Sequence, residues 1–111
     1  MKTLIAISAV VVAIVAALIY VNTRPGRLDS FAVCLKDKGA VFYGAFWCPH
    51  CQNQKTMFGN SAKKLPYVEC SLPSGSGQTR VCIDKKIEGY PTWEIADSSR
   101  LTGEIALSTL A

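Results

Sequence analysis

The first part of the chain divides into an apolar run and a short polar segment. Residues 3–21 carry no charged side chain and consist mostly of Ala, Ile, Val and Leu. A helix of this length measures roughly 28 Å, close to the hydrocarbon thickness of a bilayer. We therefore predict a transmembrane anchor over residues 1–21, followed by a linker over residues 22–27 that contains Pro25 and Gly26.

A cleaved signal peptide is the alternative interpretation of the apolar run. Its only small-x-small site, residues 15–17, is followed by four further apolar residues, and residues 22–25 make a poor cleavage site. The run is also long enough to span a bilayer. We favour an uncleaved anchor, and either interpretation brings the rest of the chain to a membrane or across it.

The remaining residues alternate between helical and strand patterns. Apolar positions spaced three and four apart indicate helices, whereas short runs of β-branched and aromatic residues indicate strands. The predicted elements are a helix over 28–38, a buried strand over 40–46, a helix from the 47–51 motif to 65 with a kink or break at 59–60, a strand over 67–70, a helix over 80–88, a strand over 92–95, an edge strand over 100–102 and a helix fragment over 107–111.

This order predicts an α/β fold. Strands that alternate with helices favour parallel pairing, and the last two closely spaced strands favour a hairpin. The result is a small thioredoxin-like layout over residues 28–111, a mixed four-stranded sheet flanked by helices and preceded by one transmembrane helix. Within the 80–88 helix, we expect Val81, Ile83 and Ile87 to be buried.

Charge and cysteine content indicate which partners and which compartment to expect. The net charge of +4 comes from scattered Lys and Arg residues without a basic run, so we expect no nucleic-acid partner. Basic residues on the two sides of the anchor balance, so charge does not orient it. Five cysteines in so short a chain are unusual for a reducing cytosol. We therefore place the domain on the extracytoplasmic side, periplasmic or lumenal.

Cys48 and Cys51 form a Cys-x-x-Cys pair directly after a predicted buried strand. At the start of a helix, free backbone N–H groups and the helix dipole favour the Cys48 thiolate, which is the form that attacks disulfides. Cys51 lies one turn later and can resolve a mixed disulfide. Pro49 suits the first helical turn, and His50 can place positive charge or a hydrogen bond beside the sulfur.

Metal binding is the main alternative for this pair. A zinc site would need two more ligands, and the remaining cysteines of the soluble part do not form a second closely spaced pair. A c-type haem would need His after the second Cys, where Gln52 stands. We favour redox chemistry, with Cys48 and Cys51 as catalytic residues and no cofactor or metal.

Other residues are candidates for supporting this chemistry. Pro91, between Tyr90 and Thr92, is either an edge-strand residue or a cis proline beside the redox pair. The second interpretation, which we favour, exposes backbone groups of this tripeptide to an extended substrate. Trp47 is either a core residue or, as we favour, an apolar cover of the active-site surface.

The other three cysteines, Cys34, Cys70 and Cys82, lie outside the Cys-x-x-Cys motif. Cys70 and Cys82 flank a Ser/Gly-rich loop and are either a second redox relay or, as we favour, a structural disulfide. Closing a loop of about 12 residues is worth roughly 3 kcal/mol in the chain-entropy model. We expect Cys34 to be a small buried residue, with an exposed thiol that pairs with another chain as the alternative.

These motifs resemble the thioredoxin-like domain associated with bacterial vitamin K epoxide reductase homologues. The similar strings are residues 41–52 (VFYGAFWCPHCQ), 67–70 (YVEC) and 89–95 (GYPTWEI). In that family the domain passes electrons from reduced substrate proteins to a quinone-linked membrane oxidase. The resemblance also implies a disulfide between Cys70 and Cys82, and Cys-Pro-His-Cys is shared with periplasmic disulfide donors.

The resemblance implies an anchored protein thiol–disulfide oxidoreductase that is recycled by a separate vitamin K epoxide reductase-like oxidase. This chain has one predicted span and no oxidase bundle, so the two would act as separate proteins. Phe42 stands where cytosolic thioredoxins carry an acid that helps to deprotonate the second cysteine, which leaves Glu69 as a candidate base. An anchored disulfide reductase and a non-catalytic metal-binding module remain alternatives.

Overall fold

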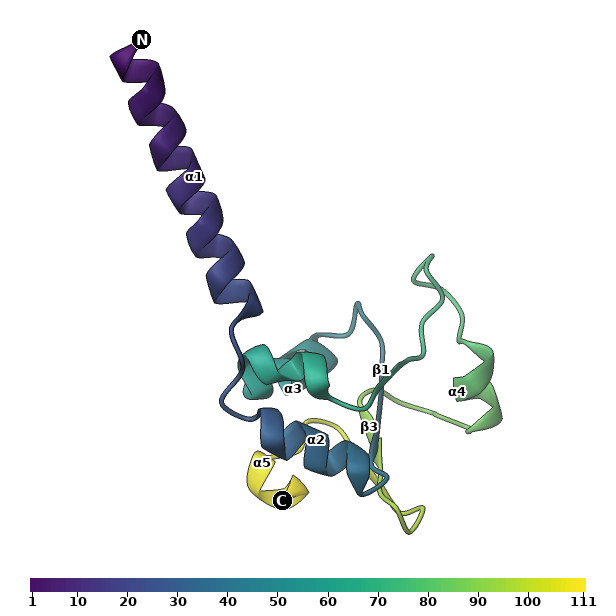
Figure 1. Cartoon of the computed structure of the whole chain (residues 1–111). Coiled ribbons are helices and arrows are strands. Elements are labelled where there is room, and N and C mark those ends of the chain that lie inside the picture. The colour runs from purple at the N-terminus through teal and green to yellow at the C-terminus, as the bar shows by residue number, and fades with distance from the viewer.

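The computed structural model describes residues 1–111 as a long N-terminal helix joined to a small α/β domain (Figure 1). The elements are α1 (Lys2–Thr23), α2 (Asp29–Asp37), β1 (Val41–Gly44), α3 (Pro49–Phe58), the 3₁₀ helix η1 (Gly59–Lys64), β2 (Tyr67–Glu69), α4 (Arg80–Asp84), β3 (Thr92–Glu94), β4 (Arg100–Thr102) and α5 (Leu107–Leu110).

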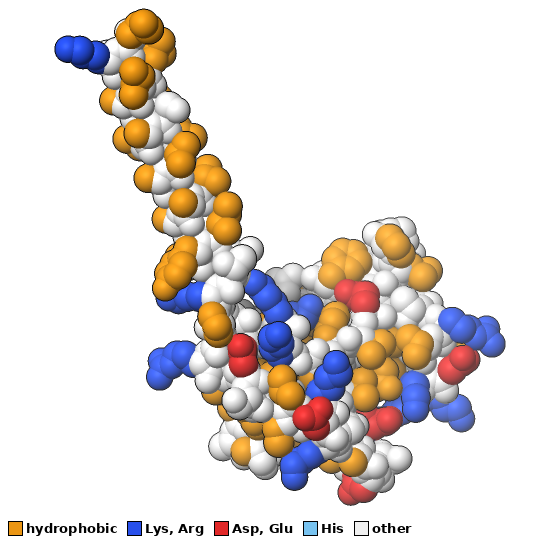
Figure 2. Space-filling model, in the orientation of Figure 1, with side chains coloured by type: hydrophobic (Ala, Val, Ile, Leu, Met, Phe, Trp, Pro, Cys, Tyr) orange, Lys and Arg blue, Asp and Glu red, His pale blue; other side chains and the backbone are white.

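Helix α1 projects away from the domain and buries none of its side chains. Hydrophobic side chains cover its visible face along its length, as Figure 2 shows. Its length and composition are sufficient to cross a membrane. The helix continues to Thr23, two residues beyond the predicted end of the anchor, so the first two residues of the predicted linker are helical.

The four strands form one mixed sheet in the order β2-β1-β3-β4. β1 pairs in parallel with β2, with Phe42 opposite Tyr67, and antiparallel with β3. β3 and β4 form the antiparallel hairpin that the sequence predicted. The thioredoxin-like α/β layout is therefore confirmed, although β1, β2, β3 and α4 are shorter than predicted.

The main core lies on the face of the sheet covered by α2, α3 and α5. The Phe42 ring stacks on Trp93, with centroids 4.8 Å apart, and both side chains are fully buried. Phe58 of α3 completes this aromatic cluster. A smaller cluster around Tyr43, which points to the opposite face, is covered by α4. The redox-motif helix α3 is thus seated on the larger core.

Two burial predictions are wrong. Val81 and Ile83 are exposed, and only Ile87 of the three expected residues is buried, because the five-residue α4 turns Cys82 inward instead. Cys34 is also exposed rather than buried. α2 buries Ala32 and Leu35, and Cys34 lies outside that narrow stripe.

The linker packs directly against η1. The Leu28 backbone N–H donates to Ser61 Oγ at 2.8 Å, and Asn60 Nδ2 donates to the Val21 carbonyl at 3.1 Å. Gly26 lies so close to η1 that a Cβ atom there would be 2.2 Å from Ser61 Oγ. The segment between α1 and the domain is therefore seated on the protein surface.

Candidate functional site

Cys48 lies at the N-cap of α3, at the end of the loop that follows β1. Pro49 occupies the first turn of α3, where its missing N–H leaves no helical hydrogen bond unmade. The Cys48 thiol faces the Tyr90 carbonyl, with 3.8 Å between Sγ and O. The loop from β1 thus brings the first cysteine of the motif against the residue that precedes Pro91.

Cys51 is fully buried beneath Cys48, and both are free thiols. Burial is the main reason that the pKa of Cys51 is raised to about 12, and its neighbour Cys48 adds to the rise. A backbone hydrogen bond from Ala45 and the positive charge of Lys55 act in the opposite direction. Cys51 therefore holds its proton firmly at neutral pH.

Gly44, the last residue of β1, allows this close packing. A Cβ atom at Gly44 would lie 2.9 Å from Tyr67 Cε2 and 3.0 Å from Cys51 Sγ. Real Cβ atoms need more room than this. The absence of a side chain at Gly44 therefore lets Tyr67 and Cys51 approach the same point from two elements.

β2 holds the loop that carries the motif. Glu69 Oε2 accepts the backbone N–H of Phe46 at 3.2 Å and that of Ser71 at 3.1 Å. The Trp47 indole N–H donates to Ser71 Oγ at 2.8 Å. Two side chains at the end of β2, Glu69 and Ser71, therefore hold the two residues that precede Cys48.

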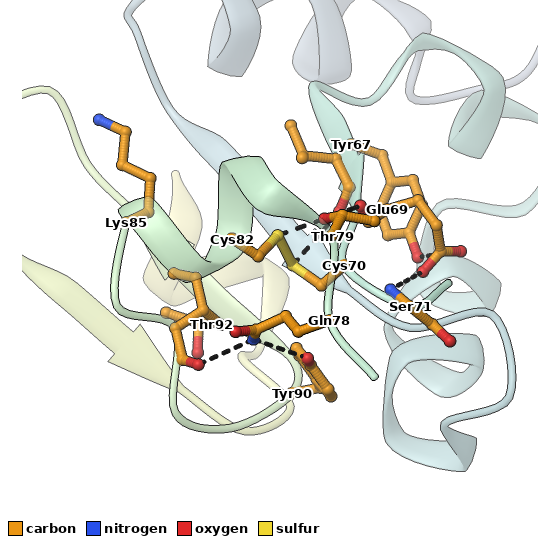
Figure 3. Close-up of a disulfide and its surroundings, with 12 residues drawn as sticks. Tyr67, Glu69, Cys70, Ser71, Gln78, Thr79, Cys82, Lys85, Tyr90 and Thr92 are labelled. Atoms are coloured by element: carbon orange, nitrogen blue, oxygen red, sulfur yellow. Dashed lines mark hydrogen bonds between the residues drawn. A yellow bond between two sulfur atoms is a disulfide. The ribbon is translucent and has the colours of Figure 1, made fainter. Parts of the chain in front are cut away.

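A disulfide joins Cys70, directly after β2, to Cys82 of α4 (Figure 3). Thr79, at the start of α4, donates its hydroxyl to the Glu69 carbonyl at 3.1 Å. These links tie the intervening loop to the end of β2. They also lie next to Glu69 and Ser71, so the disulfide supports the residues that hold the motif loop.

Tyr90 and Pro91 are joined by a cis peptide bond next to Cys48. The Tyr90 hydroxyl accepts a hydrogen bond from Gln78 Nε2 at 2.8 Å. Thr92 is buried, and its hydroxyl donates to the Gly89 carbonyl at 2.7 Å. This places the Tyr90 and Pro91 backbone beside the Cys48 thiol. The Thr92 side chain instead bonds within the turn that begins at Gly89.

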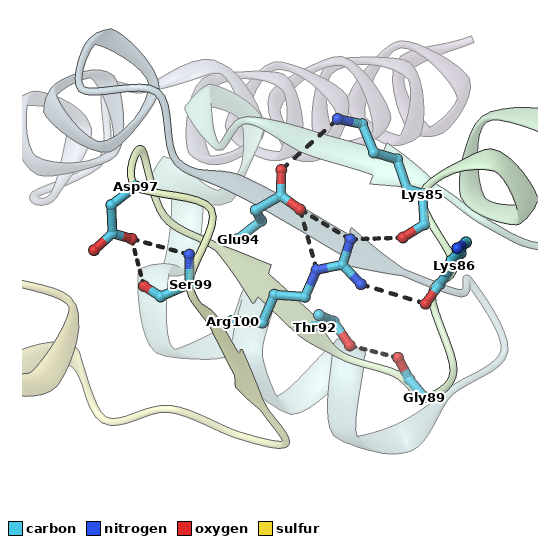
Figure 4. Close-up of polar contacts among 8 residues, drawn as sticks. All are labelled: Lys85, Lys86, Gly89, Thr92, Glu94, Asp97, Ser99 and Arg100. Carbon is cyan, nitrogen blue, oxygen red and sulfur yellow. Dashed lines mark hydrogen bonds and ion pairs between the residues drawn. The ribbon is translucent and has the colours of Figure 1, made fainter.

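The turn before Tyr90 is tied to the β3–β4 hairpin (Figure 4). Arg100 of β4 forms an ion pair with Glu94 of β3 at 3.0 Å. The same guanidinium donates to the carbonyls of Lys85 and Lys86, at 2.6 and 3.3 Å. The hairpin therefore helps to fix the segment that leads to Pro91.

His50 and Trp47 line the outer side of the motif. His50 is exposed, and its Nδ1 lies 3.4 Å from Glu104 Oε2. Trp47 is half-exposed and meets the Tyr90 ring edge-on, with centroids 6.0 Å apart. The exposed side of the site is thus largely aromatic.

The structure brings together Trp47, Cys48, Cys51 and the Tyr90–Pro91 pair, and no group of three or more His, Cys, Asp or Glu side chains could hold a metal. Sequence reasoning missed Tyr67 and Ser71. The alternation along β2 could have placed Tyr67 and Glu69 on one face, but no sequence signal indicates that this face meets Cys51.

Comparisons with known proteins agree with this fold. No known protein-family model matches the chain. The chain is 51% identical over 81 residues to the thiol-disulfide oxidoreductase LTO1 of Arabidopsis thaliana, a match that covers 69% of this chain and 21% of that protein. It is 38% identical over 60 residues to a thioredoxin domain-containing protein 5 homologue of Drosophila melanogaster, covering 46% of this chain and 14% of the relative. The chain therefore carries a thioredoxin-like domain and spans about a fifth or less of each relative.

Proposed function

We propose that this chain is a membrane-anchored protein thiol–disulfide oxidoreductase whose redox pair is Cys48 and Cys51. The observation that carries the proposal is the position of the Cys48 thiol, at the N-cap of α3 and 3.8 Å from the carbonyl that precedes a cis proline. An extended peptide laid along Tyr90 and Pro91 would bring its own sulfur to Cys48. The name of the Arabidopsis relative supports the same chemistry.

The proposed direction is oxidative. A substrate thiolate attacks Cys48 Sγ of the Cys48–Cys51 disulfide, and Cys51 leaves as a thiolate that takes up a proton. A second substrate thiolate then attacks the substrate sulfur of the mixed disulfide and releases Cys48. The substrate gains one disulfide and loses two electrons, and the Cys48–Cys51 pair accepts them.

Reoxidation by a vitamin K epoxide reductase-like membrane oxidase is the proposed second half of the cycle. In Figure 1 the loop after β1 and the loop before α4 lie on the upper side of the domain, the side toward which α1 extends. The exposed side chains Phe46, Trp47 and Leu72 belong to these loops. The linker is seated on η1, which supports the proposal that this apolar end lies toward the membrane that α1 would span, on the extracytoplasmic side.

The reduction potential of the pair tests the proposed direction. The full chain in detergent, carrying Cys34→Ser to remove the exposed third thiol, would be equilibrated with glutathione buffers. A potential well above thioredoxin's approximately −270 mV supports a disulfide donor. A potential at or below that value overturns the oxidative direction and identifies an anchored reductase.

Substitution of Cys48 tests the chemistry itself. Cys48→Ser should abolish both insulin reduction and oxidation of a dithiol peptide, because Cys48 is the thiol that faces the peptide-binding backbone. Cys34→Ser is the matched control, since the Cys34 side chain is exposed on α2, and this variant should keep both activities. Full activity in the Cys48→Ser chain would exclude this pair as the redox centre.

A further inference from the structure

The redox cycle requires a proton to enter and leave a fully buried thiol. Cys51 must lose its proton to form a disulfide with Cys48 and must regain it when that disulfide opens. Burial disfavours the thiolate of Cys51 and raises its pKa. Efficient exchange therefore needs a proton acceptor within hydrogen-bond reach or one bridging water away.

Tyr67 is the polar side chain that reaches Cys51 from the sheet. A single point above Gly44, where a Cβ atom would be, lies 3.0 Å from Cys51 Sγ and 3.3 Å from the Tyr67 hydroxyl. The Tyr67 ring packs edge-on against Phe42 on the face of the sheet that α3 covers. The hydroxyl is therefore held close to the sulfur by packing on both sides.

Glu69 orients the Tyr67 hydroxyl. The Tyr67 O–H donates to Glu69 Oε1 at 3.2 Å, while Glu69 Oε2 is held by the N–H groups of Phe46 and Ser71. A hydroxyl whose proton is committed to a carboxylate can offer only lone pairs to a second neighbour. Tyr67 is thus oriented as an acceptor for a thiol proton.

We propose that Tyr67 and Glu69 form the proton relay of Cys51, an inference that rests on the proposed redox role of the Cys48–Cys51 pair. As Cys51 attacks Cys48 in a mixed disulfide, the Cys51 proton passes to the Tyr67 oxygen, directly or through one water. The Tyr67 proton passes to Glu69 Oε1 at the same time. A Cys48–Cys51 bond forms and the sulfur of the partner that was joined to Cys48 leaves as a thiolate; the reverse transfer protonates Cys51 when the disulfide opens.

The charges around the relay fit this role. Lys55 of α3 lies over the Tyr67 ring, with Nζ 3.7 Å from the centroid, and also favours the Cys51 thiolate. Burial is the main reason that the pKa of Tyr67 is raised, and Glu69 and both thiols add to the rise, so a phenolate is disfavoured and Tyr67 ends the transfer protonated. The proton therefore moves on to Glu69, which is only partly buried and can exchange it with solvent.

The experiment measures the formation of a mixed disulfide on Cys48 and its resolution by Cys51 separately. The reduced full chain, in a Cys34→Ser background and in detergent, would be mixed with oxidised glutathione and quenched with acid at short times. Mass spectrometry then measures the glutathione mixed disulfide on Cys48. In the unsubstituted chain Cys51 should resolve it quickly, whereas Tyr67→Phe should slow resolution about tenfold or more at pH 7, so that the mixed disulfide accumulates.

The pH dependence separates proton transfer from a structural effect. In Tyr67→Phe the resolution rate should rise about tenfold per pH unit between pH 7 and 9, because only hydroxide then removes the Cys51 proton, and the defect should shrink as pH rises. Glu69→Gln should show the same trend. Tyr43→Phe is the matched control, since it removes a tyrosine hydroxyl from β1 on the opposite face of the sheet, and it should resolve at the unsubstituted rate.

Two results would overturn the relay. One is a Tyr67→Phe chain that resolves the mixed disulfide at the unsubstituted rate and with the same pH profile. The other is a loss of rate by a constant factor at every pH, which would indicate displaced sulfur atoms rather than a lost acceptor. If the unsubstituted chain forms no mixed disulfide on Cys48, the proposed redox function fails instead.

Discussion

Substitution of Gly44 by Ala is a direct test of the packing beneath the Cys48–Cys51 pair. Gly44 is in an ordinary strand conformation, so Ala meets no backbone strain there. Its methyl group would instead lie 2.9 Å from Tyr67 Cε2 and 3.0 Å from Cys51 Sγ. Both distances are well inside the contact separation of about 3.5–4 Å at which such atoms attract.

The expected cost follows from two opposing terms. Overpacking a well-packed site lowers the free energy of unfolding by about 1–3 kcal/mol. Replacing Gly by Ala also stiffens the unfolded chain, which returns about 0.4–1 kcal/mol. Gly44→Ala should therefore lose about 1–2 kcal/mol of stability.

Gly89→Ala is the matched control, because a Cβ atom at Gly89 would have nothing within 4 Å. Gly89→Ala should only stiffen the unfolded chain, so its free energy of unfolding should rise by up to about 1 kcal/mol. Urea unfolding of the full chain in detergent, followed by the fluorescence of Trp47 and Trp93, measures the difference. Equal midpoints for the two variants would refute the close approach of Tyr67 and Cys51 at Gly44.

Three further predictions concern stability and the linker. Replacing both Cys70 and Cys82 by Ala opens a loop with a sequence separation of 12 and should lower the free energy of unfolding, measured by urea, by about 3 kcal/mol; an unchanged midpoint would contradict this. The pKa of Cys51 rises on folding from 9.0 to about 12, so the unfolded thiol ionises first and the reduced chain should lose stability as pH rises through this range. A Cys51→Ala chain should lose less over the same range, and equal pH slopes of the unfolding free energy would count against the shift. Gly26→Val should push the linker off Ser61 and speed trypsin cleavage at the linker arginines, whereas unchanged cleavage would show that the linker is not seated there.

Local patterns predicted the elements because periodicity is a property of neighbouring residues. The uncharged run before Asn22 indicated the long apolar helix, and the alternation of helices and strands indicated the mixed sheet. The Cys48–Cys51 spacing after an apolar strand indicated a helix that begins at the motif. These features depend on residues that lie within one or two turns of each other.

Burial in short elements was harder to predict. Val81 and Ile83 are apolar but lie two positions apart, on different sides of a helix, and the position that the five-residue α4 buries is Cys82, which is bonded to Cys70. Cys34 is exposed because α2 meets the core along a stripe that Ala32 and Leu35 already fill. In both cases the outcome was decided by the partner element rather than by the segment.

The sequence by itself determined the apolar N-terminal helix, the α/β order and the identity of the two motif cysteines. Only the tertiary structure decided that Tyr67 meets Cys51 above Gly44 while donating to Glu69, and that the linker lies against η1. The physical reason is that periodicity fixes which face a side chain points to, whereas the crossing of β1, β2 and α3 fixes what it meets there. Residues far apart in sequence become neighbours only when the sheet and its helices have packed.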